Sequence, residues 1–139
     1  MEITIRYGNA ADLATASSFD RYTPEHILVW KLEHHDILLA EDERGCVGYL
    51  KLEHLWSQFP YIGLIKVKEE YRGGGIGKRM LHFVITQLQQ QGVHALYSSS
   101  QADEPDPQRW HRKMGFFECG IINGINDGNV GEIFFVIKF

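Results

Sequence analysis

Four glycines lie together with three basic residues in the segment Tyr71–Arg79, a composition that suits the binding of a phosphate group. Glycine has no side chain, so a ligand can reach the main-chain N–H groups directly. A strand-like apolar run, Ile62–Val67, precedes the segment, and a helix-like run, Met80–Gln91, follows it. The N–H groups at a helix start point in one direction and carry the positive end of the helix dipole. The sequence therefore predicts a phosphate-binding turn between a strand and a helix.

The spacing of the glycines excludes two common phosphate-binding motifs. A Walker A loop requires Gly-x-x-x-x-Gly-Lys followed by Ser or Thr, but Arg72 replaces the first glycine and Arg79 replaces the hydroxyl residue. A dinucleotide-binding Rossmann loop requires Gly-x-Gly-x-x-Gly, but Lys78 replaces its last glycine. The pattern that fits is Arg-x-x-Gly-x-Gly, formed by Arg72, Gly75 and Gly77.

The composition predicts one globular domain and a small anionic ligand. A chain of 139 residues, 44% of them hydrophobic, is long enough to bury its own core. Residues 66–79 hold five basic and two acidic residues although the whole chain carries a net charge of −4, which favours a small polyanion over nucleic acid. No apolar run reaches the roughly 18 residues of a membrane span, and the N-terminus does not read as a signal peptide. We therefore expect a cytoplasmic protein without a membrane partner.

The cysteines and histidines do not predict a metal site. Cys46 and Cys119 lack ligand-like spacing, and none of the seven histidines forms a standard metal-binding pair. We expect both thiols to be reduced and no metal to be bound.

The hydrophobic periodicity predicts strands and helices in the order β-α-α-β-β-β-α-β-α-β-β. Two helices are predicted to start at a capping residue followed by proline, at Thr23-Pro24 and at Asp106-Pro107. Hairpins that alternate with helical crossovers predict a mixed sheet covered by helices. The predicted strands cover residues 2–7, 37–40, 46–55, 61–68, 95–99, 116–122 and 133–139, and the predicted helices cover 9–19, 24–34, 76–91 and 106–114.

The glycine motif and the order of the elements resemble the GNAT superfamily of N-acetyltransferases. In that family an Arg-x-x-Gly-x-Gly motif between the fourth strand and the third helix holds the pyrophosphate of coenzyme A. A second segment, Trp110–Phe116, is similar to the family's aromatic-Tyr-x-x-x-Gly-Phe helix end. The resemblance covers essentially the whole chain and implies a single domain over residues 1–139. The implied fold is α/β (α+β), with a central mixed, mostly antiparallel sheet of about seven strands flanked by about four helices.

The resemblance also implies an activity and a binding site. The activity would be transfer of an acetyl group from acetyl-CoA to a primary amine of a small molecule or protein, by direct attack in a ternary complex. The Val67 N–H would bind the thioester oxygen, as an oxyanion hole does. The residues implied to hold the pantetheine are Ile65, Lys66 and Val67, and those implied to hold the pyrophosphate are Arg72, Gly73, Gly74, Gly75, Ile76, Gly77 and Lys78.

The catalytic acid and base are less clear from the residues. His111 stands where the family often has a Tyr general acid; it would either protonate the leaving thiolate or only line the cleft. The family often has a Glu base on the fourth strand, where this chain has Tyr61. Glu53 and His54 on the neighbouring strand are the candidate bases, and strand alternation points them to opposite faces.

Several aromatic residues are candidates for the wall of an acceptor pocket, namely Trp30, Trp56, Phe59 and Tyr61, unless they only pack in the core. Such a wall with acidic residues nearby would suit a small cationic amine. The alternative function is a non-catalytic sensor or regulatory module that binds acyl-CoA. The apolar run 133–139 would need cover if it formed a sheet edge, which leaves a homodimer open.

Overall fold

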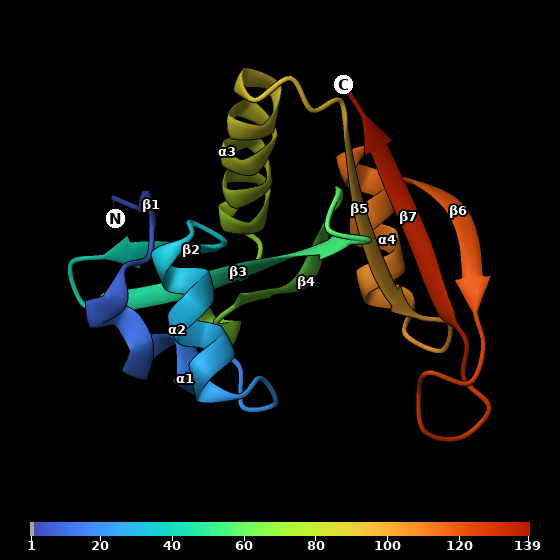
Figure 1. The fold of residues 1–139 in the computed structure, drawn as a ribbon, viewed down its shortest axis with the longest axis horizontal. Coiled ribbons are helices and arrows are strands. Elements are labelled where there is room, and N and C mark those ends of the chain that lie inside the picture. The colour runs from blue at the N-terminus through green and yellow to red at the C-terminus, as the bar shows by residue number, and fades with distance from the viewer. Residues whose placement is uncertain (1) are drawn as a thin grey trace. The chain divides into compact units, whose positions relative to one another are not determined.

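In the computed structural model, which describes residues 2–139, seven strands form one sheet in the order β1-β2-β3-β4-β5-β7-β6. Four α-helices and two 3-10 helices connect them (Figure 1). This architecture confirms the predicted α/β fold with a mixed, mostly antiparallel sheet. The strands are β1 (Thr4–Tyr7), β2 (Ile37–Asp42), β3 (Gly45–Leu55), β4 (Phe59–Val67), β5 (Ala95–Gln101), β6 (Phe117–Ile122) and β7 (Glu132–Lys138). The helices are η1 (Ala10–Asp12), α1 (Leu13–Phe19), α2 (Glu25–Glu33), η2 (Glu69–Tyr71), α3 (Ile76–Gln90) and α4 (Pro105–Met114).

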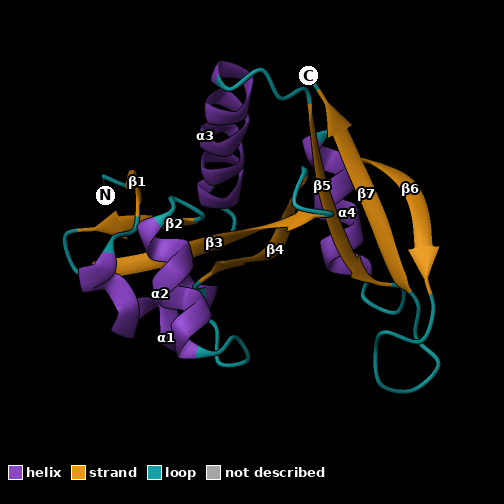
Figure 2. Ribbon diagram, in the orientation of Figure 1, coloured by secondary structure: helices purple, strands orange, loops and turns teal. Residues whose placement is uncertain are grey.

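The chain divides into two compact units, and each is described by itself. The first unit comprises Met1–Glu53 and Gly63–Thr86, and the second comprises His54–Ile62 and Gln87–Phe139. Figure 2 shows that each unit contains both strands and helices. Within the described residues 2–139, no helix is both long enough and apolar enough to cross a membrane.

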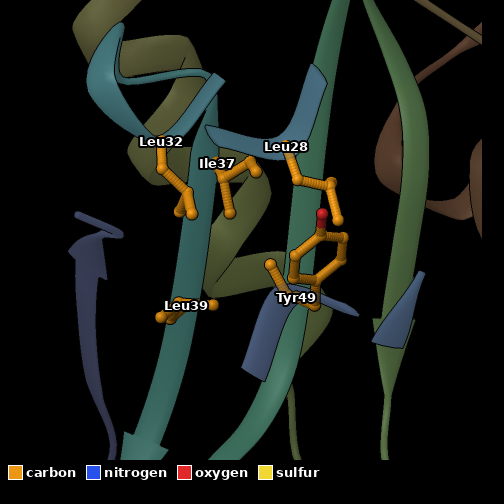
Figure 3. Packing of buried hydrophobic residues seen from close by; sticks show 6 residues of the cluster. Leu28, Leu32, Ile37, Leu39 and Tyr49 are labelled. Atoms are coloured by element: carbon orange, nitrogen blue, oxygen red, sulfur yellow. The ribbon is translucent and has the colours of Figure 1, made fainter. Parts of the chain in front are cut away.

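The core of the first unit depends on strand alternation in β2 and β3. One face packs against α1 and α2 through a cluster of fully buried residues (Figure 3): Ala16, Leu28, Leu32, Ile37, Leu39 and Tyr49. On the opposite face, a Cβ added at Gly48 would lie 3.1 Å from Met80 Cε and 3.3 Å from Ile76 Cγ2. The glycine in β3 therefore allows the first turn of α3 to pack closely on the sheet.

In the second unit, β7 pairs with β5 on one side and with β6 on the other, in both cases antiparallel. The apolar run at the C-terminus is therefore an internal strand, and β6 is the edge. This arrangement removes the observation on which the homodimer hypothesis depended. Figure 1 shows helix α4 beside β5 and β7. The ring of His111 on α4 stacks on that of Phe135 on β7, with centroids 4.6 Å apart.

The helix predicted over residues 9–19 begins as expected, but the two predicted starts with proline are wrong. Asn9 and Asp12 form a capping box before α1. Thr23 does not cap α2, because its hydroxyl donates to Asp20 and accepts from Lys51, and Pro24 takes the cap position without a side-chain bond.

At α4, Glu104 is the cap residue and Pro105 is the first helical residue, so the helix starts before the predicted Asp106 cap. Asp106 instead lies in the first turn and pairs with Arg109.

Candidate active site

The glycine turn Arg72–Gly75 joins η2 to α3 in the first unit. Gly73 and Gly75 both have φ of +82°, a left-handed conformation that other residues rarely adopt. A Cβ at either position would meet nothing within 4 Å, so neither glycine is needed for packing. The two glycines are therefore required by the left-handed backbone conformation of the turn. The main chain of the turn is exposed to solvent.

The backbone N–H groups of this turn and of the first helical residues have no protein acceptor in the described residues 2–139. The first helical N–H with an acceptor belongs to Arg79, which donates to the Gly75 carbonyl at 3.0 Å. The Arg72 side chain donates from Nε to the Val67 carbonyl at 3.0 Å and so ties the turn to the end of β4. Six consecutive N–H donors, those of Gly73, Gly74, Gly75, Ile76, Gly77 and Lys78, are thus available at a helix start.

The other residues implied to hold coenzyme A lie at the end of β4. Ile65 and Val67 are half-buried and alternate with the exposed Lys66. Lys78 and Arg72 are exposed as well, so the positive charge predicted for this segment lies at the surface of the first unit. The turn is therefore a basic, donor-rich surface that suits an anionic group.

Glu53 lies in a cluster of four charged side chains between β3 and α2. Its carboxylate accepts from Lys31 Nζ at 2.8 Å and lies 3.4 Å from Lys51 Nζ. Lys51 also donates to Asp20 at 2.7 Å, and both lysines are buried. Burial would raise the pKa of Asp20, but hydrogen bonds from Lys51 and Thr23 outweigh it and hold the pKa below the ordinary value. The Glu53 carboxylate thus contributes negative charge to both buried lysines, Lys31 and Lys51, which Asp20 alone would not neutralise.

The place of Glu53 depends on Gly63 in β4. A Cβ at Gly63 would lie only 2.7 Å from Glu53 Cγ, so the glycine makes room for the glutamate side chain across the strand. Tyr49 is fully buried in the same unit, and its hydroxyl has no hydrogen-bond partner among residues 2–139. Burial is the main reason that the pKa of this phenol is raised. His54, the second candidate base, is exposed at the end of β3 and belongs to the second unit.

His111 is buried between α4 and the sheet of the second unit, with both ring nitrogens hydrogen-bonded. Nδ1 lies 2.7 Å from the Pro107 carbonyl, which can only accept, so Nδ1 carries the proton. In the neutral ring Nε2 is then the acceptor for the Ser98 hydroxyl at 2.7 Å. Burial lowers the pKa of His111 below its ordinary value, despite smaller opposing effects from Pro107 and Glu132. His111 was expected either to protonate the leaving thiolate or only to line the cleft. Its burial and its two hydrogen bonds within the protein favour the second role.

The aromatic candidates divide between the two units, with Trp30 in the first and Trp56, Phe59 and Tyr61 in the second. Trp30 is 51% exposed on α2 in the first unit and stacks on His34 at 3.9 Å. Trp56 and Phe59 lie together at the turn into β4, with ring centroids 6.0 Å apart. Tyr61 is half-buried on β4, and its ring lies 5.6 Å from that of Phe134.

The sequence did not predict which residues form hydrogen bonds with the Tyr61 hydroxyl. Tyr61 Oη lies 2.6 Å from Ser99 Oγ, and Ser99 donates to Glu132 at 2.6 Å. These residues are 38 and 33 positions apart along the chain, and only the pairing of β5 with β4 and β7 brings them together. No local motif could have indicated this contact.

The family model of the GNAT acetyltransferases matches residues 8–116 of the chain. The protein therefore belongs to the GNAT acetyltransferase family, as the glycine motif and the order of the elements predicted. No curated protein sequence matches the chain at a significant level.

Solved structures agree with the fold. A candidate streptothricin acetyltransferase from Bacillus anthracis, in complex with acetyl coenzyme A, aligns with a TM-score of 0.68 and 22% identity over 74% of this chain. This chain covers 61% of that protein's length. The ribosomal-protein-S18-alanine N-acetyltransferase from Escherichia coli aligns with a TM-score of 0.81 and 17% identity over 99% of this chain and 94% of its own.

YncA, a candidate acetyltransferase from Salmonella typhimurium solved with its cofactor acetyl-CoA, aligns with a TM-score of 0.82 and 16% identity over 99% of this chain and 94% of its own. At these identities the three likenesses show a shared fold. The class of the protein, an acetyltransferase, comes from the family that the sequence matches.

Proposed function

We propose that the protein transfers an acetyl group from acetyl-CoA to a primary amine of a small molecule or protein, with residues 1–139 acting as one transferase domain. The observation that carries the proposal is the turn with six N–H donors at the start of α3. A Cβ added at Gly73 or Gly75 would meet nothing within 4 Å, so these two glycines leave open space over the backbone. Two structural neighbours in the family fold contain acetyl-CoA, which supports the same donor here.

In this proposal the pyrophosphate binds the N–H groups of Gly73–Lys78, and the charges of Arg72 and Lys78 add to the attraction. The pantetheine lies along Ile65, Lys66 and Val67, so the thioester carbonyl can accept from the Val67 N–H. The free amine attacks the thioester carbon, a C–N bond forms, and the C–S bond breaks. The thiolate takes up a proton as coenzyme A leaves.

A second function, a sensor module that binds acyl-CoA without catalysis, is favoured by one observation. Nδ1 of His111 is hydrogen-bonded to the Pro107 carbonyl and Nε2 to the Ser98 hydroxyl, so both ring nitrogens already have partners within the protein and neither is directed at a leaving thiolate. A thiolate with a reference pKa of about 8.5 can leave without an acid, however, so catalysis does not require one.

The test is release of free thiol from acetyl-CoA with a panel of amines: ethylamine, putrescine, spermidine, tyramine and a tetrapeptide with a free N-terminus. The proposal predicts amine-dependent thiol release with at least one of them, and mass spectrometry should find the acetylated amine. Binding of acetyl-CoA without turnover on any amine would favour the sensor function. Absence of acetyl-CoA binding would contradict both.

A further inference from the structure

The glycine turn of the first unit is open at its centre. A Cβ added at Gly73 or Gly75 would meet nothing within 4 Å, so packing against side chains does not fix these residues. The main-chain N–H groups from Gly73 to Lys78 have no acceptor within the described residues 2–139. The position of these donors therefore depends on the contacts of the segments at the two ends of the turn.

At the helix end, two contacts fix the start of α3. Ile76 and Met80 lie so close to β3 that a Cβ on Gly48 would be 3.3 Å from the first side chain and 3.1 Å from the second. Arg79 Nη2 donates to the Ile3 carbonyl, just before β1, at 2.8 Å. These contacts join α3 to the sheet of the first unit, but they do not fix the end of the turn that follows β4.

At the strand end, a tyrosine makes a contact with a distant part of the same unit. Tyr71 Oη donates to Asp42 Oδ2 at 2.7 Å, although the two residues lie 29 positions apart. The other contacts at this end are local, because Arg72 Nε donates to the Val67 carbonyl five positions away and the Arg72 N–H donates within η2. Among the described residues, the Tyr71 hydroxyl thus makes the last contact with a remote segment before the glycines begin.

Asp42 is held in turn by the hairpin between β2 and β3. It pairs with Gly45 at the end of the strand register, and its Oδ1 accepts from the Arg44 N–H at 2.8 Å. The other oxygen, Oδ2, is the one that accepts from Tyr71. The carboxylate therefore joins the backbone of the hairpin turn to the segment that enters the glycine turn.

The charge states of the two groups favour this hydrogen bond at neutral pH. The hydrogen bond from Tyr71 is the main reason that the pKa of Asp42 lies below its ordinary value. The same hydrogen bond is the main reason that the pKa of Tyr71 is raised. The carboxylate is therefore ionised and the phenol protonated, and a hydrogen bond to an ionised acceptor is stronger than one between neutral groups.

Charge alone would give Asp42 the opposite effect on an anionic ligand. Its carboxylate places a negative charge one tyrosine side chain away from a turn that is proposed to bind a pyrophosphate. If only the charge mattered, removal of the carboxylate would strengthen the binding of an anion. Removal of a contact that positions the turn would weaken it. The sign of the change in affinity therefore separates the two effects.

We propose that Asp42 and Tyr71 are positioning residues, which hold the glycine turn in the conformation that binds the pyrophosphate and so make the affinity for acetyl-CoA depend on the β2–β3 hairpin. This inference rests on the proposed binding of acetyl-CoA and adds a determinant of affinity outside the glycine motif. Neither side chain needs to touch the ligand, because both act through the main chain of the turn. Without the hydrogen bond, a smaller fraction of the molecules holds the donors in the binding conformation, and the apparent affinity falls by that fraction.

The experiment measures acetyl-CoA binding by calorimetry, together with thermal unfolding, for the whole wild-type chain and its variants. Tyr71→Phe removes the hydroxyl and keeps the ring. Asp42→Ser keeps one oxygen that can accept from the Arg44 N–H but is too short to reach Tyr71 as well. The double variant tests whether the two residues act through one hydrogen bond.

Two matched controls make the same kinds of change without breaking this hydrogen bond. Glu43→Gln removes one negative charge from an exposed position of the same hairpin turn. Tyr7→Phe removes a tyrosine hydroxyl from β1 of the same unit and keeps the ring that stacks on His35.

Both single variants of the pair should raise the dissociation constant for acetyl-CoA roughly threefold to tenfold, as the loss of one such hydrogen bond would. The double variant should bind about as weakly as the weaker-binding single variant, because the two residues share one bond. Both control variants should bind at least as tightly as the wild type. With any amine that is acetylated, the KM for acetyl-CoA should rise in Tyr71→Phe while kcat and the KM for the amine stay unchanged, a separation that a general loss of structure would not produce.

Several results would overturn the inference. Tighter binding by Asp42→Ser would show that its charge outweighs any positioning, and unchanged affinity of Tyr71→Phe with a lower melting temperature would assign the hydrogen bond to stability alone. An equal loss of affinity in Glu43→Gln or Tyr7→Phe would trace the effect to the unit as a whole. These outcomes leave the proposed function standing, whereas a wild-type protein that failed to bind acetyl-CoA would remove that function and the inference with it.

Discussion

Substitution of Gly75 by glutamate should weaken coenzyme A binding by about two orders of magnitude while the fold survives. Gly75 has φ of +82° and open space around it, so the new side chain meets no steric clash. Its carboxylate would instead extend from the turn whose N–H groups are proposed to hold the pyrophosphate. The variant therefore places a negative charge where the ligand carries its own.

Two magnitudes follow from this geometry. A left-handed residue other than glycine costs about 1–2 kcal/mol, which corresponds to a fall of roughly 3–7 °C in the melting temperature of a chain of this length. A carboxylate about 5 Å from one pyrophosphate charge costs roughly 3 kcal/mol at an effective dielectric constant of about 20. This energy weakens binding by about two orders of magnitude.

Gly92 provides a matched control for the same substitution. It follows the other end of α3, has φ of +76°, and a Cβ added there would also meet nothing within 4 Å. Gly92→Glu should lose at least as much stability, because a negative charge is unfavourable at a helix C-terminus. It should nevertheless bind acetyl-CoA like the wild type.

The assay is calorimetric titration with acetyl-CoA alongside thermal unfolding of both variants. Equal affinity of Gly75→Glu and Gly92→Glu would refute the placement of the pyrophosphate at this turn. A loss of binding in both would mean that strain in the backbone, and not the position of the charge, controls affinity.

Three further predictions concern the buried groups. Asp20→Asn should lower the free energy of unfolding by about 3 kcal/mol, since it leaves Lys51 buried without its main counter-charge; urea unfolding would measure this. Because the folded-state pKa of Asp20 is lowered, its contribution is complete above the unfolded-state pKa of about 3.9 and is lost as the pH falls through the lower folded-state value. Unfolding at pH 7 and at pH 3 should therefore differ less in Asp20→Asn than in the wild type. Gly63→Ala should displace Glu53 from its lysines, so Glu53→Gln should cost less stability in that background than in the wild type, as a double-mutant cycle would show. His111→Ala should cost roughly 2–4 kcal/mol through a cavity and an unpaired hydroxyl and leave the shape of the kcat pH profile unchanged; a lost limb of that profile would restore the acid role.

Local signals in the sequence were sufficient for the elements and for the glycine turn. The helices predicted over residues 9–19 and 76–91 and the glycine pattern each depend on residues close together in the sequence, and the structure contains all three. The helix start at Thr23 was predicted wrongly because a long-range partner, Lys51, takes the hydroxyl that would cap the helix.

The long-range hydrogen bonds between side chains could not be predicted in the same way. His111 is hydrogen-bonded to Ser98, and both Tyr61 and Glu132 are hydrogen-bonded to Ser99. Each of these contacts is set by the register of β5 against its neighbours. A single sequence predicts which residues lie on strands, but the exact register decides which hydroxyl meets which carboxylate.

The most direct measurement is calorimetric titration of the whole protein with acetyl-CoA, with desulfo-CoA and ATP as comparison ligands. The proposed site predicts micromolar binding of acetyl-CoA, comparable binding of desulfo-CoA, which retains the pyrophosphate, and much weaker binding of ATP. Equal affinity for ATP and acetyl-CoA would mean that the turn binds phosphates without selecting coenzyme A. No binding of acetyl-CoA would contradict the central claim.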